Sequence, residues 1–404
     1  MVRVAIKPIE GGVTAAKGFL AAGVHCGLKA QGLDLAVIFS EVPAAGAAVF
    51  TTNKVAAAPV LLSRQHLGSG PMRAVVANSG NANACNGERG MEDARAMAAA
   101  AAKALGVETE QVFVASTGVI GQPLAIDKVE AGIKQAASVL SIDGGEDAAR
   151  AIMTTDTRKK ERAVVVDING VQVRIGGIAK GAGMIQPNMA TMLAFITTDC
   201  AIKEDLLQAA LKEAVDESFN MITVDGDTST NDTVIVLANG QAENPLIDQQ
   251  DEAYFAFLAG LKEIATGLAK DIVRDGEGAT KLIEVNVKGA KDFAAARQVA
   301  KAIANSNLVK TAIFGCDANW GRIICAAGYA GVDLIPSQVD IYLGDEQVAA
   351  KGAGLPFDED RVKKILEGDE VAITVDLNMG GGMATVWTCD LTYDYIKVNA
   401  SYRS

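Results

Sequence analysis

The sequence alternates between short segments that resemble strands and longer segments with helical periodicity, and this alternation constrains the fold more than any other feature. Residues 162–181 alternate apolar and polar positions on both sides of Asn169-Gly170, which is a strong hairpin signal. Residues 92–106 predict a helix, with acidic residues in the first turn and Gly106 at the end. Because the strands alternate in polarity, we expect substantial antiparallel pairing in an α+β fold of layered sheets covered by helices.

The same reasoning places the other regular elements along the chain. Further strands are expected at 73–78, 111–117, 231–240 and 280–289, with two more in 370–391, and further helices at 203–218, 251–273, 292–306 and 360–368. The change of composition at residues 242–251 predicts a surface loop between a strand and a helix.

Composition and charge exclude several classes of function. The 404 residues are enough for one large core or two modules, and the net charge of -12 argues against a nucleic-acid-binding protein. We see no apolar run long enough to cross a membrane and no secretion signal in residues 1–12, so we expect a cytoplasmic protein with no membrane partner. The six cysteines form no CxxC pair, so neither a disulfide framework nor a zinc site is expected.

One small-residue segment, "KGAGMIQPNMATMLAF" at 180–195, contains Thr191, which begins a predicted strand. Two histidines in the whole chain make a Ser-His-Asp arrangement improbable, but an N-terminal threonine carries its own base, the α-amino group. Creating that amine at Thr191 requires cleavage of the Ala190-Thr191 bond, with Thr117 and Gly118 as a suitable pair of oxyanion donors. Most threonines that enter a strand are structural, and the pattern alone favours that interpretation.

Longer motifs resemble one family over nearly the whole chain. "AKGAGMIQPNMATMLAFITTD" resembles the signature of the ornithine acetyltransferase family, whose members are also called glutamate N-acetyltransferases or bifunctional arginine-biosynthesis proteins. The segments "VVANSGNANACNG", "VASTGVIGQPL", "AIMTTDT", "DESFNMITVDGDTSTNDT", "DGEGATK", "FGCDANWGRI" and "YIKVNASYRS" are similar to the family's motifs, in the family's order. The resemblance extends from about residue 10 to residue 404.

The resemblance implies an architecture and a reaction. The precursor would cut itself into an α chain of residues 1–190 and a β chain of residues 191–404, with an N-terminal-nucleophile-like sandwich of sheets between helices and an α2β2 assembly. Residues 191–280 would complete the sandwich, and about 281–404 would form a smaller C-terminal α/β subdomain. The implied reaction is a ping-pong transfer of acetyl from N2-acetylornithine to L-glutamate in cyclic arginine biosynthesis. No metal or bound cofactor is implied, and acetyl-CoA is a co-substrate of the bifunctional members.

The resemblance also implies site residues by position. They are Thr191 as nucleophile and acetyl carrier, Thr117 and Gly118 as oxyanion donors, and Thr154, Lys180, Thr191, Glu277, Asn399 and Ser404 as substrate-binding residues. Thr155 and Thr157 stay open as alternatives to Thr154, and Ser404 stands where the family commonly has threonine. A glutamate can meet the ornithine cation and a lysine a carboxylate. Without the family motifs, Lys180 would be interpreted as a solvated loop charge and Glu277 as an ordinary turn residue.

Two other functions remain as alternatives. An aminopeptidase of related fold would use the same nucleophile with water as acceptor, and a non-catalytic protein would bind acetylated amino acids without turnover. The sequence gives no role to the blocks 78–86 and 317–322, and it does not decide between monofunctional and bifunctional activity or predict regulation by arginine.

Overall fold

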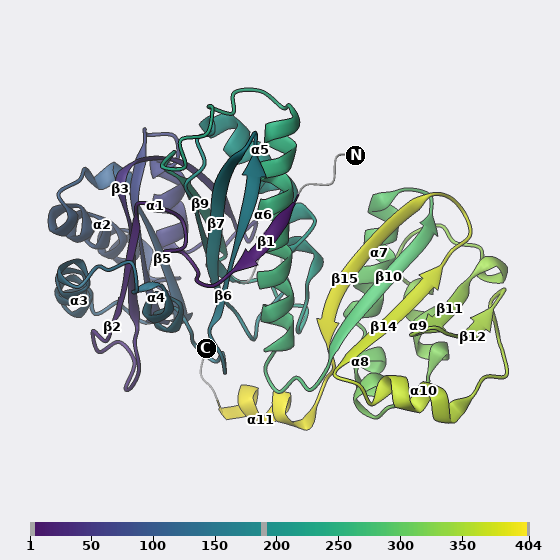
Figure 1. Cartoon of the computed structure of the whole chain (residues 1–404). Helices are drawn as coiled ribbons and strands as arrows, with labels where there is room; N and C mark the ends of the chain where they lie inside the picture. Colours follow the sequence, from purple (N-terminus) through teal and green to yellow (C-terminus); the bar gives the residue numbers. More distant parts are fainter. Residues whose placement is uncertain (1–4, 187–191, 402–404) are drawn as a thin grey trace.

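The computed structural model describes residues 5–186 and 192–401. Figure 1 shows a larger lobe that contains β1 to β9 and a smaller lobe that contains β10 to β15. Helix α6 lies on the side of the larger lobe that faces the smaller one, and α11 leads back beneath the larger lobe. The predicted cleavage point, Ala190-Thr191, and the predicted binding residue Ser404 lie outside the described residues.

The larger lobe is built on a sheet with nine strands in the described part of the chain, in the order β1-β6-β7-β8-β9-β3-β4-β5, with β2 also paired to β3. The strands are β1 (Ile6–Ile9), β2 (Phe19–Val24), β3 (Leu35–Phe50), β4 (Met72–Asn81), β5 (Val112–Val119), β6 (Lys160–Ile168), β7 (Val171–Lys180), β8 (Leu193–Thr198) and β9 (Thr233–Ala238). Strand β3 pairs with β2 and β4 through its first half and with β9 through its second half. This long strand therefore joins two layers of sheet.

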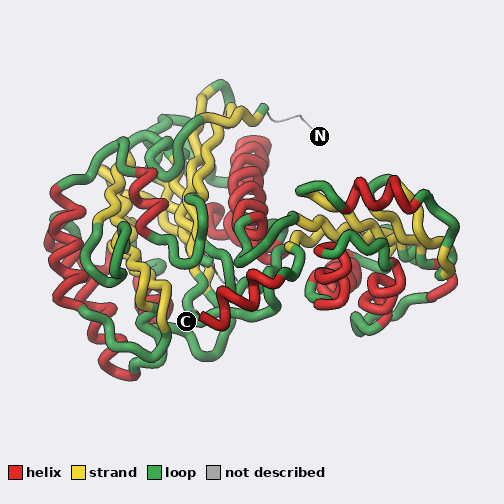
Figure 2. The backbone as a smooth tube through the Cα atoms, turned by 90° about the horizontal axis from the view of Figure 1, so that it is seen from below, coloured by secondary structure: helices red, strands yellow, loops and turns green. Residues whose placement is uncertain are grey.

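The two layers face each other across a buried apolar cluster. Side chains of β4 and β5, such as Val75 and Phe113, pack there with Leu193 and Phe195 of β8 and Leu237 of β9. Helices cover both outer faces, so the order is helix, sheet, sheet, helix, and Figure 2 shows strands enclosed between helices. The helices of this lobe are α1 (Ala58–His66), α2 (Gly87–Leu105), α3 (Ile126–Ser138), α4 (Gly145–Ala151), α5 (Glu204–Asp216) and α6 (Glu252–Arg274). The expected α+β sandwich is confirmed.

Local signals in the sequence explain several boundaries. Asn169 and Gly170 have φ values of 54° and 84°, which suit the two-residue turn between β6 and β7. Gly106 ends α2 in the left-handed conformation, and Asp251 caps α6 by accepting from two backbone N–H groups. Most pairs in the larger sheet are antiparallel, as expected, with β4–β5 and β8–β9 as parallel pairs.

The smaller lobe holds a sheet with six strands in the described residues, in the order β13-β12-β11-β14-β10-β15. These are β10 (Leu282–Ala290), β11 (Asp340–Leu343), β12 (Glu346–Ala350), β13 (Ala353–Gly354), β14 (Glu370–Asp376) and β15 (Gly382–Cys389). The helices that follow residue 290 are α7 (Phe293–Ala304), α8 (Asn307–Phe314), α9 (Trp320–Gly328), α10 (Glu359–Leu366) and α11 (Tyr393–Ser401). The division of the chain near residue 281 stays a prediction.

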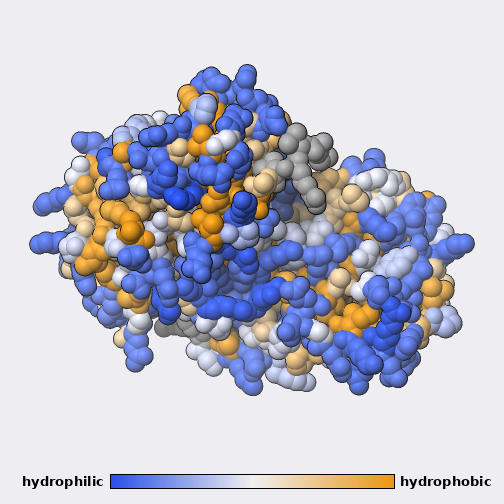
Figure 3. Space-filling model, viewed as in Figure 1, coloured by the Kyte–Doolittle hydropathy of each residue, from blue (hydrophilic) through white to orange (hydrophobic). Residues whose placement is uncertain are grey.

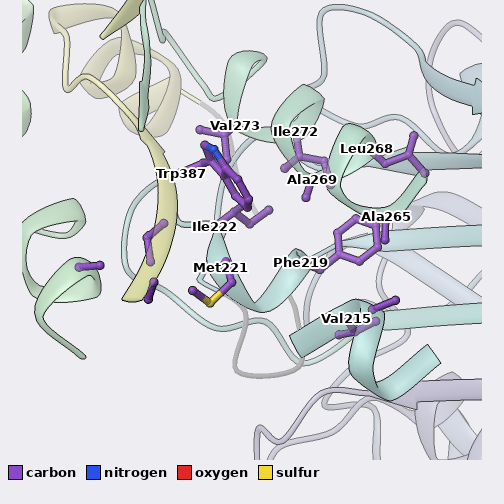
Figure 4. Packing of buried hydrophobic residues seen from close by; sticks show 14 of the residues in the cluster. Val215, Phe219, Met221, Ile222, Ala265, Leu268, Ala269, Ile272, Val273 and Trp387 are labelled. Carbon is purple, nitrogen blue, oxygen red and sulfur yellow. The ribbon is translucent and has the colours of Figure 1, made fainter. Parts of the chain in front are cut away.

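A continuous apolar cluster connects the two lobes. Figure 4 shows Trp387 of β15 beside Ile222 and Val273, and all three belong to the cluster that also covers the outer face of the larger sheet. The Trp387 indole donates to Glu284 at 2.9 Å, and the ammonium of Lys270 lies 4.8 Å from the indole ring centre. The lobes therefore share one core.

The polarity of the visible face and the character of the helices can be described for the residues that the structure covers. Figure 3 shows mostly polar residues on the face that spans the junction of the two lobes. Among the described residues, no helix combines the length and the apolar character that crossing a membrane requires.

Candidate active site

A pocket lies where several strands of the larger sheet end beside the start of α11. Strand β7 ends at Lys180, which pairs with Leu193 at the start of β8, and Leu193 pairs in turn with Thr233 at the start of β9. The pocket is lined by Ala82, Thr117, Gly118, Ile120, Thr154, Thr155, Lys180, Gly183, Met184, Met192, Leu193, Asp225, Asp227, Ser229, Asn231, Asp232, Glu277, Tyr395 and Asn399. Both layers and both lobes therefore contribute to one concave site.

Lys180 is buried in this pocket and is surrounded by oxygen atoms. Its Nζ donates to Thr154 Oγ1 at 2.7 Å and to Thr117 Oγ1 at 3.5 Å, and it lies 3.9 Å from Asp156 Oδ2. Burial lowers the pKa of Lys180 below its ordinary value, and the charge of Asp156 opposes this effect. The side chain can present a buried positive charge to an anionic group.

The three threonines that the sequence left open occupy different places. Thr154 and Thr155 line the pocket, whereas the Thr157 hydroxyl donates to the carboxylate of Asp275. Because the Thr157 hydroxyl already has this partner away from the pocket, the geometry favours Thr154 or Thr155 as the substrate-binding threonine. The contact to Lys180 favours Thr154 of these two.

Thr117 and Gly118 lie at the end of β5, where it runs parallel to β4. Gly118 has a φ of +136°, and a Cβ added there would lie 2.4 Å from the carbonyl carbon of Gly80. Only glycine permits this close approach of two backbones. Asn78 and Asn231 support the turn, since Asn78 accepts from Ser116 and Asn231 donates to the Ser116 carbonyl. Asn78 and Asn231 therefore hold the end of β5, which carries the predicted oxyanion donors.

Glu277 and Asn399 meet on the side of the pocket nearer the smaller lobe. Asn399 Nδ2 donates to Glu277 Oε2 at 2.8 Å, and the Glu277 backbone N–H donates to the Ala182 carbonyl at 2.9 Å. Helix α11 approaches closely, because a Cβ on Gly278 would lie 2.4 Å from the backbone nitrogen of Tyr395. The predicted acid and the predicted amide thus form one contact.

Two groups of pocket residues were missed by the sequence reasoning. Asp225, Asp227, Ser229, Asn231 and Asp232 come from the segment "VDGDTSTND", whose density of polar residues just before a strand was the available signal. Tyr395 donates its hydroxyl to Asp225 Oδ2 at 3.3 Å. Partial burial of the phenol, followed by the charge of Asp225, raises the pKa of Tyr395. Asp225 also accepts from the backbone N–H groups of Met184 and Ile185, at 2.6 and 2.8 Å, so it holds the segment that leads toward residue 187.

The structure brings together six of the predicted site residues that it describes, although they lie far apart in the sequence. Thr117, Gly118, Thr154, Lys180, Glu277 and Asn399 line one pocket. Met192, which follows the predicted nucleophile, lines the same pocket. The block 317–322 lies elsewhere: Arg322 donates to the Leu308 carbonyl rather than to Asp317. Among the described residues, no group of histidine, cysteine, aspartate and glutamate is arranged to hold a metal ion.

Comparison with known proteins identifies the family. The model of the ArgJ family matches residues 20–404. The arginine biosynthesis bifunctional protein ArgJ of Symbiobacterium thermophilum is 56% identical over 399 residues, which cover 98% of this chain and 99% of the relative. The chain belongs to the ArgJ family. The ArgJ of Bacillus subtilis is 50% identical over 400 residues, which cover 99% of this chain and 98% of the relative.

A solved structure of the family agrees with the match. The crystal structure of arginine biosynthesis bifunctional protein ArgJ from Bacillus halodurans is 49% identical with a TM-score of 0.52, and it covers 52% of this chain and 100% of the solved chain. The predicted family and the predicted class, an acetyltransferase enzyme of arginine biosynthesis, are confirmed. Membership favours acetyl transfer over the aminopeptidase and the non-catalytic binding protein.

Proposed function

We propose that this ArgJ enzyme moves an acetyl group from N2-acetylornithine to L-glutamate and that Thr191 carries the acetyl group between them. The observation that supports this proposal is the convergence of Thr117, Gly118, Lys180 and Glu277 on one pocket beside Met192. An acetylated amino acid presents a carboxylate, an amide carbonyl and a side chain, and the pocket offers a cation, hydrogen-bond donors and an acid for them.

The chemical steps assign one role to each group. The Thr191 hydroxyl attacks the acetyl carbonyl of N2-acetylornithine, and the α-amino group of Thr191 accepts the hydroxyl proton. Thr117 and the Gly118 amide donate to the oxyanion. The α-amino group of Thr191 then passes the proton to the leaving nitrogen, so ornithine departs and an acetyl ester remains on Thr191. The amino group of glutamate then attacks this ester and releases N-acetylglutamate, with the free Thr191 hydroxyl restored.

Substrate contacts follow the charges of the pocket. Lys180 meets the α-carboxylate, and Thr154 lies within hydrogen-bond distance of the Lys180 ammonium, beside the same substrate group. Glu277, with Asn399 bound to it, meets the side-chain cation of ornithine. The family motif at residues 395–404 adds the hydroxyl of Ser404 to the proposed substrate-binding groups.

The free amine of Thr191 arises in this proposal by self-cleavage after Ala190. A whole solved chain of the Bacillus halodurans relative spans 52% of this chain, which fits the length of residues 191–404 and supports cleavage at this point. The two chains then assemble as α2β2. Because its curated relatives are named bifunctional, we extend the proposal to acetyl-CoA as a second acetyl donor for glutamate.

Gel analysis and N-terminal sequencing test the cleavage. Purified protein should give two bands of similar size on a denaturing gel. Sequencing of the β band, residues 191–404, should release threonine in its first cycle. The native mass should equal that of two precursors. Thr191→Ala should remain one full-length, inactive chain. Thr311→Ala, which alters a threonine on α8 outside the pocket, should be cleaved and active. An active protein that remains uncut contradicts the proposed nucleophile.

Activity assays test the substrates. Transfer from N2-acetylornithine to glutamate should occur without acetyl-CoA, and a labelled acetyl group should be found on Thr191 when glutamate is omitted. A separate assay with acetyl-CoA and glutamate tests the second donor. Absence of this second reaction would remove acetyl-CoA from the proposal and leave the transfer from N2-acetylornithine unaffected. Hydrolysis of peptides in place of acetyl transfer would contradict the proposal.

A further inference from the structure

Four buried charged side chains form a chain of alternating sign that starts at the pocket. Lys180 Nζ lies 3.9 Å from Asp156 Oδ2, Asp156 Oδ1 lies 2.6 Å from Lys160 Nζ, and Lys160 Nζ lies 2.6 Å from Asp275 Oδ2. These side chains are between 0% and 9% exposed. Buried ion pairs of this kind contribute little net stability, because the cost of removing the charges from water offsets their attraction. Stability alone therefore does not explain why the chain buries these four charges.

Asp156 connects the parts of the pocket that must keep their places. Its Oδ2 accepts from the backbone N–H of Thr154 at 3.0 Å, and its Oδ1 accepts from the backbone N–H of Gly181 at 2.7 Å as well as from Lys160. The same carboxylate therefore fixes the loop of the substrate-binding threonine and the start of the segment that leads toward residue 187.

Asp275 continues this arrangement away from the pocket, to the end of α6. It accepts from the backbone N–H of Thr157 at 3.1 Å and holds the Thr157 hydroxyl as well. Asp275 caps the end of α6 and stands two residues before Glu277. Lys160 thus connects Asp156, the carboxylate near Lys180, to Asp275, the carboxylate at the end of α6.

We propose that Asp156 and Lys160 are positioning residues that tune the charge and fix the orientation of Lys180 for binding the substrate carboxylate. The inference rests on the proposed function, in which Lys180 must be protonated to hold that carboxylate. Asp156 stabilises the ammonium of Lys180 directly. Lys160 destabilises the ammonium of Lys180 by repulsion between like charges. Lys160 also pairs with Asp156, which weakens the attraction of Asp156 for Lys180.

The electrostatics give the two residues opposite effects. Lys180 loses its proton more easily than an exposed lysine because burial disfavours the charged form. The charged groups that face it are Asp156, Lys160, Glu277, Asp232 and Lys29. Removing the charge of Asp156 should lower the pKa of Lys180 further, and removing the charge of Lys160 should raise it.

The test compares pH profiles of kcat/KM for N2-acetylornithine in wild type, Asp156→Asn and Lys160→Met. In Asp156→Asn the alkaline limb should move to lower pH by about 1 to 3 units, as expected for loss of an opposite charge at this distance. In Lys160→Met the alkaline limb should move to higher pH. Asp271→Asn on α6 breaks the partly exposed ion pair with Arg162 of β6 and should leave the limb in place.

Shifts of opposite sign distinguish positioning by charge from a merely structural role, which would lower activity without moving the limb in both directions. Should either single variant fail to fold, the double variant Asp156→Asn/Lys160→Met removes one charge of each sign. Its limb should lie between wild type and the limb expected for Asp156→Asn, because Asp156 is nearer to Lys180. Wild-type transfer with unmoved limbs in the folded variants overturns this inference alone, whereas a wild type without acetyl transfer overturns the proposed function.

Discussion

At the scale of single residues, the strongest steric constraint at the pocket is at Gly118. Its backbone lies against Gly80 and Asn81, and an added Cβ would lie 2.4 and 2.5 Å from backbone atoms of these residues. Gly118→Ala should therefore push β5 away from β4 and displace both oxyanion donors. An alanine held at the φ of +136° that glycine adopts here would add on the order of 1–3 kcal/mol to the cost of folding. We expect a destabilised chain that accumulates as uncut precursor, measured by denaturant unfolding and by the cleaved fraction on a gel.

Gly121→Ala is the matched control for this prediction. Gly121 also has a positive φ, of +76°, but an added Cβ would meet no atom within 4 Å. This variant carries the conformational cost without the displacement of β5, so it should be slightly less stable and normally cleaved. Equal cleavage of the two variants would show that the position of Gly118 does not limit the oxyanion site.

The residue scale also shows what the sequence could predict of the site. Thr117, Gly118, Thr154, Lys180, Glu277 and Asn399 were predicted from family motifs, and the structure brings them to one pocket. Asp156 was not singled out, although it is inside the quoted motif "AIMTTDT". Its importance comes from pairing with Lys160 and Lys180 after the chain has folded, and spacing along the sequence does not encode such pairing. Tyr395 was missed for the same reason.

At the scale of elements, α11 serves the site more than it serves the core. None of its described residues is buried, and it reaches the pocket through Tyr395 and Asn399. Asn399→Asp keeps the shape but places a second carboxylate beside Glu277. We expect KM for N2-acetylornithine to rise about tenfold or more, and the free energy of unfolding to change by no more than about 0.5 kcal/mol.

Ile396→Ser on the same helix provides the control for Asn399→Asp. Ile396 is 62% exposed, so its replacement tests whether any change in α11 impairs the enzyme. Steady-state kinetics should give wild-type KM for Ile396→Ser. A tenfold rise in both variants would mean that α11 acts through its general packing and not through the Asn399–Glu277 contact.

Helix α7 carries a lysine whose burial costs stability. Burial, followed by repulsion from Arg297 one turn away, lowers the pKa of Lys301 to about 8 from 10.5. Below pH 8 this lysine is charged in both states, so the folded state bears the full cost, which disappears as the pH rises toward 10.5. Lys301→Met should therefore raise the free energy of unfolding at pH 7 by about 1–2 kcal/mol.

Denaturant unfolding at pH 7 and at pH 10 measures this effect. The advantage of Lys301→Met should shrink between the two pH values, because wild type itself gains stability over that range. Lys364→Met on α10 replaces an exposed lysine and should show little change at either pH. An advantage that is the same at both pH values would indicate better packing of the methionine and not removal of a buried charge.

Elements with strong local signals were predicted, and those without them were not. The hairpin at Asn169-Gly170 and the long amphipathic helices carry period and cap signals that survive folding. Strands β2 and β3, with the sequences "FLAAGV" and "LAVIFSEVPAAGAAVF", are rich in alanine and glycine and show no clean alternation. Their pairing depends on two-layer packing, where small side chains let α4 approach β2 closely. Helix α2 begins at Gly87, five residues before the predicted start, because no side chain caps its first turn and no signal in the sequence marks the boundary.

At the scale of the whole molecule, the proposed cleavage divides the larger sheet between two chains without separating them. Residues 1–190 supply β1 to β7, and residues 191–404 supply β8 and β9. Strand β8 lies between β7 and β9, and β9 pairs with β3 through residues 45–50. Two strands of the second chain are therefore enclosed by strands of the first, with buried side chains on both faces.

The two chains should consequently remain together after cleavage. An affinity tag at the N-terminus should retain residues 191–404 through washes at low and high salt, because the contact rests on backbone hydrogen bonds and apolar burial, which salt screens little. Denaturant should release residues 191–404 and leave residues 1–190 on the resin. The uncut Thr191→Ala precursor should stay on the resin in both conditions. Elution of residues 191–404 by salt alone would mean that cleavage frees β8 and β9 from the sheet, contrary to the enclosed position that the structure gives them.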